Sequence, residues 1–260
     1  MVLLLIFILG LFVGSFLNVL ADRLPKEESA IKGRSHCEKC KKELAWFDLI
    51  PLLSFIFLKG KCRYCRTSLS FYYPIVELTT GILFAGVFIF IGGAYINFIS
   101  TINIINLIYY LFIASSLIVV FFADLKYGII PDKIVFPAII ISFLYLILNT
   151  YYLIPPHLLS ALGAGLFFLA LLIVTRGKGM GFGDVKFAFL MGLILGFPNI
   201  VVALYIAFLT GAIVGCILII WKRRETFGTV IPFGPFLATG TLLSIFFGNF
   251  IVQNFLRVLH

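Results

Sequence analysis

Charged residues are scarce in this sequence, and their scarcity excludes a soluble globular enzyme. Of the 260 residues, 12% are charged and 62% are hydrophobic, whereas soluble domains carry about 25% charged residues. Long apolar runs are typical of polytopic membrane proteins. Because a spanning segment must satisfy its own backbone hydrogen bonds, we predict an all-α fold with about eight transmembrane helices.

Acidic residues are fewer still, which leaves a net charge of +9. Residues 22–72 hold eleven Lys/Arg and six Asp/Glu, and the other charges lie mostly in short clusters between apolar runs. This distribution is typical of basic loops retained on the cytoplasmic side of a bilayer. It argues against a nucleic-acid partner.

No basic stretch precedes the first apolar run, MVLLLIFILGLFVGSFLNVLA. A retained first helix over 1–21 is therefore expected, with the N-terminus outside and residues 22–72 in the cytoplasm. Seven more helices are expected at about 74–92, 103–123, 134–152, 158–175, 187–197, 199–221 and 233–256. Eight crossings put the basic markers between them on the cytoplasmic side: Lys126, Lys133, Arg176, Lys178, Lys222, Arg223 and Arg224.

One of these spans is too short for a bilayer. Residues 185–197 make about 20 Å of helix at 1.5 Å per residue, against a hydrocarbon core of about 30 Å. Asp184, which precedes them in GMGFGDVK, is therefore predicted to lie in a recess or beside a thinned bilayer.

Cysteine is rare, yet four of the five cysteines form two knuckles inside an internal repeat. CEKCKKELAWF and CRYCRTSLSFY match at an offset of 25 residues. The repeat predicts a structural zinc site that stabilises a small zinc-ribbon-like insert, with these four ligands: Cys37, Cys40, Cys62 and Cys65. Redox-active thiols and an unmetallated insert are alternatives. His36 could compete as a ligand, but it is expected to be a solvated histidine. Cys216 is expected to be an apolar filler within the membrane.

Five acidic residues lie outside the insert. Glu225 is expected to be a solvated loop charge, and Asp132 to cap its helix. Glu77 falls in the first turn after Pro74, where the helix dipole favours it. Asp124 and Asp184 lie at the cytoplasmic ends of predicted helices, where ionisable groups are functional candidates. An ion pair with Lys126 or Lys186, respectively, is the alternative for either residue alone.

A pair of aspartates at equivalent depth favours acid–base chemistry. Two adjacent carboxylates share a proton, so one can take a proton from water while the other protonates a leaving amine. Gly181 and Gly183 would allow an extended peptide backbone to approach Asp184 closely. Lys186 is expected to support the site, either as an ion-pair partner of Asp184 or as a contact for an acidic group of the substrate.

Six blocks in order make the chain resemble the bacterial type IV prepilin peptidases. They are GSFLNVLADRLP, the cysteine knuckles around LAWFDLIPLLSF, LSFYYPIVELTTG, FADLKYGIIPD, GMGFGDVK and IPFGPFLATG. The resemblance implies an intramembrane aspartic protease of the glycine–x–glycine–aspartate type, with Asp124 and Asp184 as its catalytic residues. Its substrates would be prepilins and pseudopilins, whose basic leaders are cut after a glycine at the cytoplasmic face of the inner membrane.

The resemblance also implies N-methylation of the new N-terminus with S-adenosylmethionine. No glycine-rich loop of the Rossmann type is present, so the methyl-donor site is placed near Glu77 by resemblance alone. The implied domains are a first transmembrane helix (1–21), a zinc-binding insert associated with methylation (22–73) and a transmembrane peptidase (74–260). A proton-coupled transporter and a peptidase without methylation are the alternatives. The first lacks a repeat across the spans, and the second is disfavoured by the insert.

Overall fold

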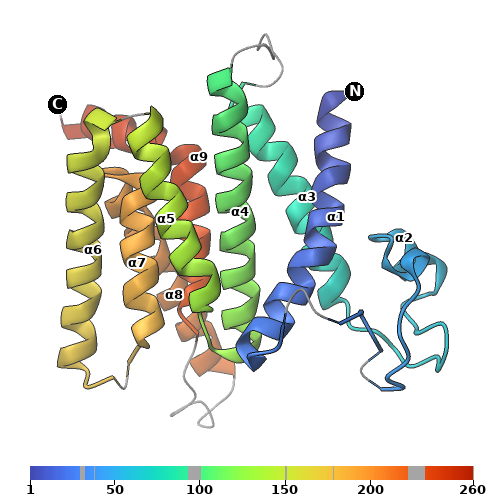
Figure 1. Cartoon of the computed structure of the whole chain (residues 1–260). Coiled ribbons are helices and arrows are strands. Elements are labelled where there is room, and N and C mark those ends of the chain that lie inside the picture. The colour runs from blue at the N-terminus through green and yellow to red at the C-terminus, as the bar shows by residue number, and fades with distance from the viewer. Residues whose placement is uncertain are drawn as a thin grey trace. The chain divides into compact units, whose positions relative to one another are not determined.

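The computed structural model describes residues 1–29, 33–37, 39–92, 101–149, 151–177, 179–221 and 232–259. In these residues the regular elements are α-helices and short 3-10 helices (Figure 1). The insert also contains two isolated β-bridges. The α-helices are α1 (Val2–Arg23), α2 (Leu53–Phe57), α3 (Tyr72–Phe90), α4 (Thr101–Tyr127), α5 (Asp132–Asn149), α6 (Ile154–Val174), α7 (Phe182–Leu195), α8 (Asn199–Trp221) and α9 (Gly234–Leu259).

Each of the eight predicted apolar runs forms a helix, which confirms the all-α polytopic fold. Within the described ranges, seven helices are long and apolar enough to cross a membrane: α1, α3, α4, α5, α6, α8 and α9. The eighth, α7, has only 14 residues, or about 21 Å of helix. It is the helix predicted to be too short to cross a bilayer. The basic cluster Lys222, Arg223 and Arg224 and the acid Glu225 lie outside the described residues, as does Lys178.

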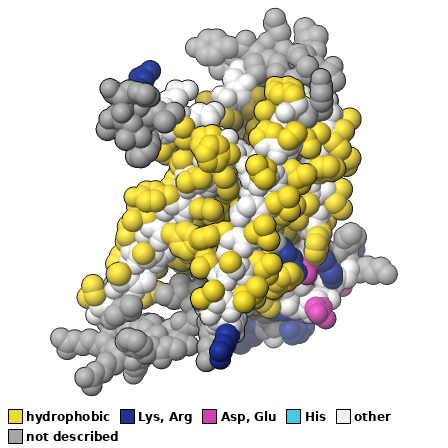
Figure 2. Space-filling model, turned by 90° about the vertical axis from the view of Figure 1, so that its left-hand side faces the viewer, with side chains coloured by type: hydrophobic (Ala, Val, Ile, Leu, Met, Phe, Trp, Pro, Cys, Tyr) yellow, Lys and Arg dark blue, Asp and Glu magenta, His cyan; other side chains and the backbone are white. Residues whose placement is uncertain are grey.

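Side-chain type also follows the expected membrane pattern. On the face shown in Figure 2, hydrophobic side chains cover the helices, while the visible acidic side chains and most of the basic ones gather at one end. Since lipid is as apolar as these side chains, exposing them is stable only inside a bilayer.

The chain divides into two compact units, Met1–Val119 and Val120–His260. In the first unit, α1 packs closely along α3 (Figure 1). Small residues permit the approach: a Cβ on Gly14 would lie 2.8 Å from the Cα of Glu77, and one on Gly10 would lie 2.8 Å from the Cα of Gly81. The helix α3 thus belongs with α1 in packing, whereas the functional boundary at residue 74 stays a prediction.

The predicted repeat in the insert is visible in its backbone. Cys37 N–H donates to Lys42 O at 3.0 Å, and 25 residues later Cys62 N–H donates to Thr67 O at 2.8 Å. A β-bridge closes each knuckle, and the two bridges keep the same offset: His36 with Glu43, and Lys61 with Ser68. The two knuckles are therefore copies of one turn.

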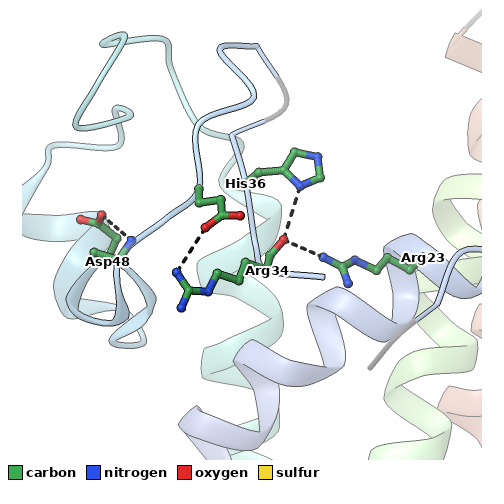
Figure 3. A network of polar contacts seen from close by, with 6 residues as sticks. Arg23, Arg34, His36 and Asp48 are labelled. Carbon is green, nitrogen blue, oxygen red and sulfur yellow. Dashed lines mark hydrogen bonds and ion pairs between the residues drawn. The ribbon is translucent and has the colours of Figure 1, made fainter. Parts of the chain in front are cut away.

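Polar contacts attach the first knuckle to the end of α1 (Figure 3). The Arg23 guanidinium donates to the carbonyl of Arg34 at 3.1 Å, and Arg34 in turn pairs with Glu43 at 3.2 Å. His36 Nδ1 lies 3.4 Å from the same carbonyl of Arg34. Carbonyl groups of an irregular loop thus find donors on the neighbouring helix.

In the second unit, α7 lies among other helices. It packs against α6 and also contacts α5, α8 and α9. Nine of its 14 residues are buried, which explains why this short helix is apolar on every side. Its C-terminal end is held by His157, whose Nδ1 lies 2.8 Å from Leu193 O, and the chain then turns at Gly196 with φ +65°.

Candidate functional site

Asp124 lies in the last turn of α4 and is only 5% exposed. Its Oδ2 accepts a hydrogen bond of 2.7 Å from the backbone N–H of Gly234, the first residue of α9. A Cβ on Gly234 would lie 2.6 Å from the same oxygen. Only glycine therefore fits beside the carboxylate. Sequence reasoning missed Gly234, although the Gly-Pro pair in IPFGPFLATG signals a helix start there.

Asp184 lies in the first turn of α7 and is 7% exposed. Its Oδ2 accepts a hydrogen bond of 2.9 Å from the N–H of Gly181, the residue that caps the helix. The acid at this position thus satisfies one of the free N–H groups at the helix start. The burial agrees with the recess predicted from the short span.

Both aspartates lie in the second compact unit. The α4–α5 connection that follows the first one packs on the start of α7, because Ile130 lies against Gly183 and Asp132 pairs with Lys186. Each carboxylate receives a backbone N–H from the beginning of a helix, where the helix dipole favours negative charge. Two interacting carboxyl groups in a buried setting can share one proton, which is what acid–base chemistry at this site requires.

The two glycines before Asp184 have different surroundings. A Cβ on Gly181 would meet nothing closer than 3.9 Å, whereas a Cβ on Gly183 would lie 3.1 Å from the Cβ of Ile130. Packing against the α4–α5 connection therefore accounts for Gly183. A role for either glycine in admitting a substrate backbone stays a prediction.

Lys186 pairs with Asp132 rather than with Asp184, so the first of its two considered roles is not the one observed, and a contact with the substrate stays a prediction. Its Nζ lies 2.6 and 2.7 Å from the two carboxylate oxygens of Asp132, the first residue of α5. The rings of Phe136 and Phe182 flank the ammonium group at 5.4 and 5.1 Å. The expected capping role does not account for Asp132, because its side chain joins α5 to α7.

Glu77 lies in the second turn of α3, because the helix begins at Tyr72 rather than at Pro74. The first-turn interpretation is therefore wrong. Its side chain is 8% exposed, accepts a hydrogen bond of 2.9 Å from Leu52 N–H and also contacts Ser15. Glu77 thus connects α3 to α1 and to the insert.

A second buried polar side chain lies on α1, one helical turn after Ser15. Asn18 is 5% exposed, and its Nδ2 donates to Tyr73 O at 3.1 Å. That bond fixes the orientation of the amide, and Asn18 Oδ1 has no hydrogen-bond partner among the described residues. A buried acceptor without a donor is uncommon in folded proteins, which makes Asn18 a candidate site residue.

The four cysteines of the insert converge, as predicted. The sulfur atoms of Cys37, Cys40, Cys62 and Cys65 all lie within 4.8 Å of one another. The Cys37 and Cys65 sulfurs are 3.8 Å apart, too far for a disulfide and close to the about 3.8 Å edge of a tetrahedron with bonds of about 2.3 Å. His36 is not part of this cluster, which can hold a metal ion with sulfur ligands alone.

Two protein-family models together match most of the chain. Residues 8–91 match the bacterial peptidase A24 N-terminal domain, and residues 111–216 match the type IV leader peptidase family. No solved structure shows significant similarity.

Curated relatives match the chain over nearly its whole length. A prepilin leader peptidase/N-methyltransferase of Bacillus subtilis (strain 168) is 32% identical, with 97% of both chains covered. Proteins of the same name are 31% identical in Burkholderia pseudomallei (strain 1026b), covering 93% of this chain and 84% of the relative, and 30% identical in Stutzerimonas stutzeri, covering 96% and 92%. This chain therefore belongs to the type IV leader peptidase family.

Proposed function

We propose that this chain is an aspartic endopeptidase of the bacterial inner membrane that processes prepilins and pseudopilins. It cuts the basic leader after a glycine at the cytoplasmic face and then N-methylates the new N-terminal residue. The observation that carries the peptidase is the pair of buried aspartates, Asp124 and Asp184, which lie in one compact unit and each accept a backbone N–H from a helix start. The names of the relatives support the substrate class and the methylation.

The proposed hydrolysis uses the two carboxyl groups in opposite protonation states. The ionised one removes a proton from a bound water, whose oxygen attacks the scissile carbonyl carbon. The protonated one donates its proton to the carbonyl oxygen, which gives a tetrahedral diol. The first carboxyl group then passes the proton taken from water to the departing amine as the C–N bond breaks, and one hydroxyl of the diol returns a proton to the second. The N–H groups of Gly181 and Gly234 hold the Oδ2 atoms in place, and the Oδ1 atoms would act on the water and the substrate.

The methyl-donor site is proposed near Glu77. S-adenosylmethionine supplies an electrophilic methyl group on a cationic sulfur. The first unit offers two buried acceptors on adjacent helices, the Glu77 carboxylate and Asn18 Oδ1. Acceptors of this kind fit a cationic ligand and the amine that it methylates. Glu77 and Asn18 would thus orient the two reactants and exclude water between α1 and α3.

The metal in the cysteine cluster is proposed to be zinc. Four thiolates at tetrahedral spacing suit zinc and leave no open position for a reacting group. Zinc would then stabilise an insert whose own core is small, and the reacting groups would come from the helices.

The decisive experiment incubates the purified protein with a prepilin peptide and isotopically labelled S-adenosylmethionine, followed by mass spectrometry. Cleavage after glycine with one added methyl group is the expected result. Cleavage without label would leave a peptidase alone, and an unchanged peptide would contradict the proposal and reopen the transporter interpretation.

A further inference from the structure

Between the two cysteine knuckles lies a segment that differs from the rest of the insert. Residues 44–58, LAWFDLIPLLSFIFL, contain a single charged residue, Asp48, while basic residues crowd both sides of it. The segment forms a 3-10 turn, Trp46–Leu49, and the short helix α2. A run of this composition in an otherwise water-facing insert requires an apolar environment.

The described residues of the first unit do not provide that environment. Trp46 is 78% exposed, Ile56 67% and Phe57 81%. Three further large apolar side chains of the segment are also exposed: Phe47, Leu49 and Leu53. Contiguous exposed apolar residues mark a binding surface rather than a core.

The one charge in the segment is neutralised internally. The Asp48 side chain is 3% exposed, and its Oδ1 accepts a hydrogen bond of 2.7 Å from Arg63 Nε. Its Oδ2 accepts the N–H of Ala45 at 3.3 Å (Figure 3). Charged groups are costly in hydrocarbon unless they are paired, so this arrangement suits a segment that leaves water.

The segment is also attached to a membrane-spanning helix below its first turn. Leu52 N–H donates to the carboxylate of Glu77, the sixth residue of α3. At 1.5 Å per residue, Glu77 lies about 7–8 Å along the helix from its start. A segment bound there reaches the depth of the membrane interface.

Basic side chains border the segment on both sides. Lys41 and Lys42 precede it and Lys59 and Lys61 follow it, all of them exposed. Lysine beside apolar aromatic residues is the pattern of interfacial anchors, because the ammonium groups reach anionic headgroups while the rings enter the acyl boundary.

We propose that residues 44–58 insert into the headgroup–acyl boundary of the bilayer and anchor the cysteine insert to an anionic lipid surface. The occupant of this surface is lipid, because its apolar face, its hidden charge, its lysine border and its attachment to α3 all match a bilayer interface. The inference requires that α1 and α3 span the membrane and is independent of any enzymatic activity.

Tryptophan fluorescence tests the proposal directly, since the chain has only two tryptophans, Trp46 and Trp221. The full chain with Trp221→Phe is reconstituted in phosphatidylcholine–phosphatidylglycerol liposomes that carry bromine at shallow or deep acyl positions. The expected result is blue-shifted emission and about a twofold or greater loss with shallow bromine, as for a ring roughly 5–10 Å deep. The matched protein with Trp46→Phe reports Trp221 alone, and circular dichroism verifies that both variants fold.

Two results would overturn the inference. Emission at the wavelength of a water-exposed indole, quenched by iodide and unaffected by either bromolipid, would place the segment in water. Shielding from iodide that grows with the protein-to-lipid ratio, again without bromolipid quenching, would identify a second copy of the chain as the occupant.

Discussion

At the scale of single residues, the two aspartates share one arrangement. Each carboxylate is buried and accepts one backbone N–H through Oδ2, Asp124 from Gly234 and Asp184 from Gly181. The donors come from the starts of α9 and α7, so they are fixed by helix geometry. A backbone N–H held in a helix moves less than a side-chain donor, so it keeps the carboxylate in one position.

Replacing either aspartate should abolish cleavage. Asp124→Asn and Asp184→Asn keep size and polarity but cannot carry the charge, so each should lower the rate of leader cleavage by about 10²–10⁴-fold or more. The double variant should be no worse than either single one, because residues that act as a unit are non-additive. The measurement is peptide cleavage in reconstituted membranes. A folded, fully active Asp124→Asn protein would refute the dyad.

Glycine substitutions beside the two aspartates form a matched pair. Gly234→Ala places a methyl group against Asp124 Oδ2, which costs about 1–3 kcal/mol through overpacking and should displace the carboxylate and inactivate the enzyme. Gly181→Ala, whose Cβ would meet no atom closer than 3.9 Å, should keep the melting temperature. Comparing cleavage with thermal unfolding separates the effects. Equal activity of Gly234→Ala and wild type would show that the Gly234 contact is dispensable.

At the scale of elements, polar contacts near both of its ends hold α7 in position. The Lys186–Asp132 ion pair joins it to the start of α5, and His157 of α6 binds the carbonyl of Leu193 near its end. A helix too short to span the bilayer needs such attachments, because lipid matching alone does not fix its depth.

Loss of the Lys186–Asp132 pair should weaken activity without abolishing it. The pair is partly solvated, with side chains 20% and 53% exposed, so its contribution is about 0.2–1 kcal/mol and the expected loss of rate is a few-fold. Lys186→Met and Asp132→Asn should behave alike, and the double variant should match either one. A Lys186→Met protein as inactive as Asp184→Asn would instead indicate direct contact of Lys186 with the reacting groups.

The cysteine knuckles should bind one zinc ion per chain. Cys37→Ser removes one of four sulfur ligands and should reduce zinc content and destabilise the insert, while Cys216→Ser, outside the cluster, should leave both unchanged. Elemental analysis together with limited proteolysis of the insert measures these effects. A wild-type insert that resists proteolysis without stoichiometric metal would contradict the zinc site.

At the scale of the whole molecule, two compact units carry the two groups of candidate residues. Glu77, Asn18 and the cysteines lie in Met1–Val119, whereas both aspartates lie in Val120–His260. This separation supports a division of labour between methylation and cleavage.

Variants in the first unit should therefore affect methylation more than cleavage. Glu77→Gln and Asn18→Leu should reduce incorporation of labelled methyl groups while a prepilin peptide is still cut. The converse control is Asp184→Asn, which should methylate a pre-cleaved peptide that already has a free N-terminus. Equal loss of both activities in folded first-unit variants would argue against separate sites.

The helices and the cysteine site could be predicted from the amino-acid sequence alone, because both depend on patterns that are local along the chain. Apolar runs of sufficient length must be helical in a bilayer, and the repeat at an offset of 25 residues imposes the same turn on both knuckles. Asp184 was recognisable in the same way, since its glycines and the short apolar run surround it directly.

The hydrogen-bond and ion-pair partners of the site residues could be read only from the tertiary structure. Gly234 and Asp124 are 110 residues apart, Lys186 and Asp132 are 54 apart, and Glu77 and Leu52 are 25 apart. Local spacing offers Asp184 as one partner for Lys186 and the dipole of its own helix as an explanation for Glu77, because composition and spacing report only local neighbours. Hydrogen bonds and ion pairs between helices depend instead on how the helices pack, and packing is a property of the whole chain.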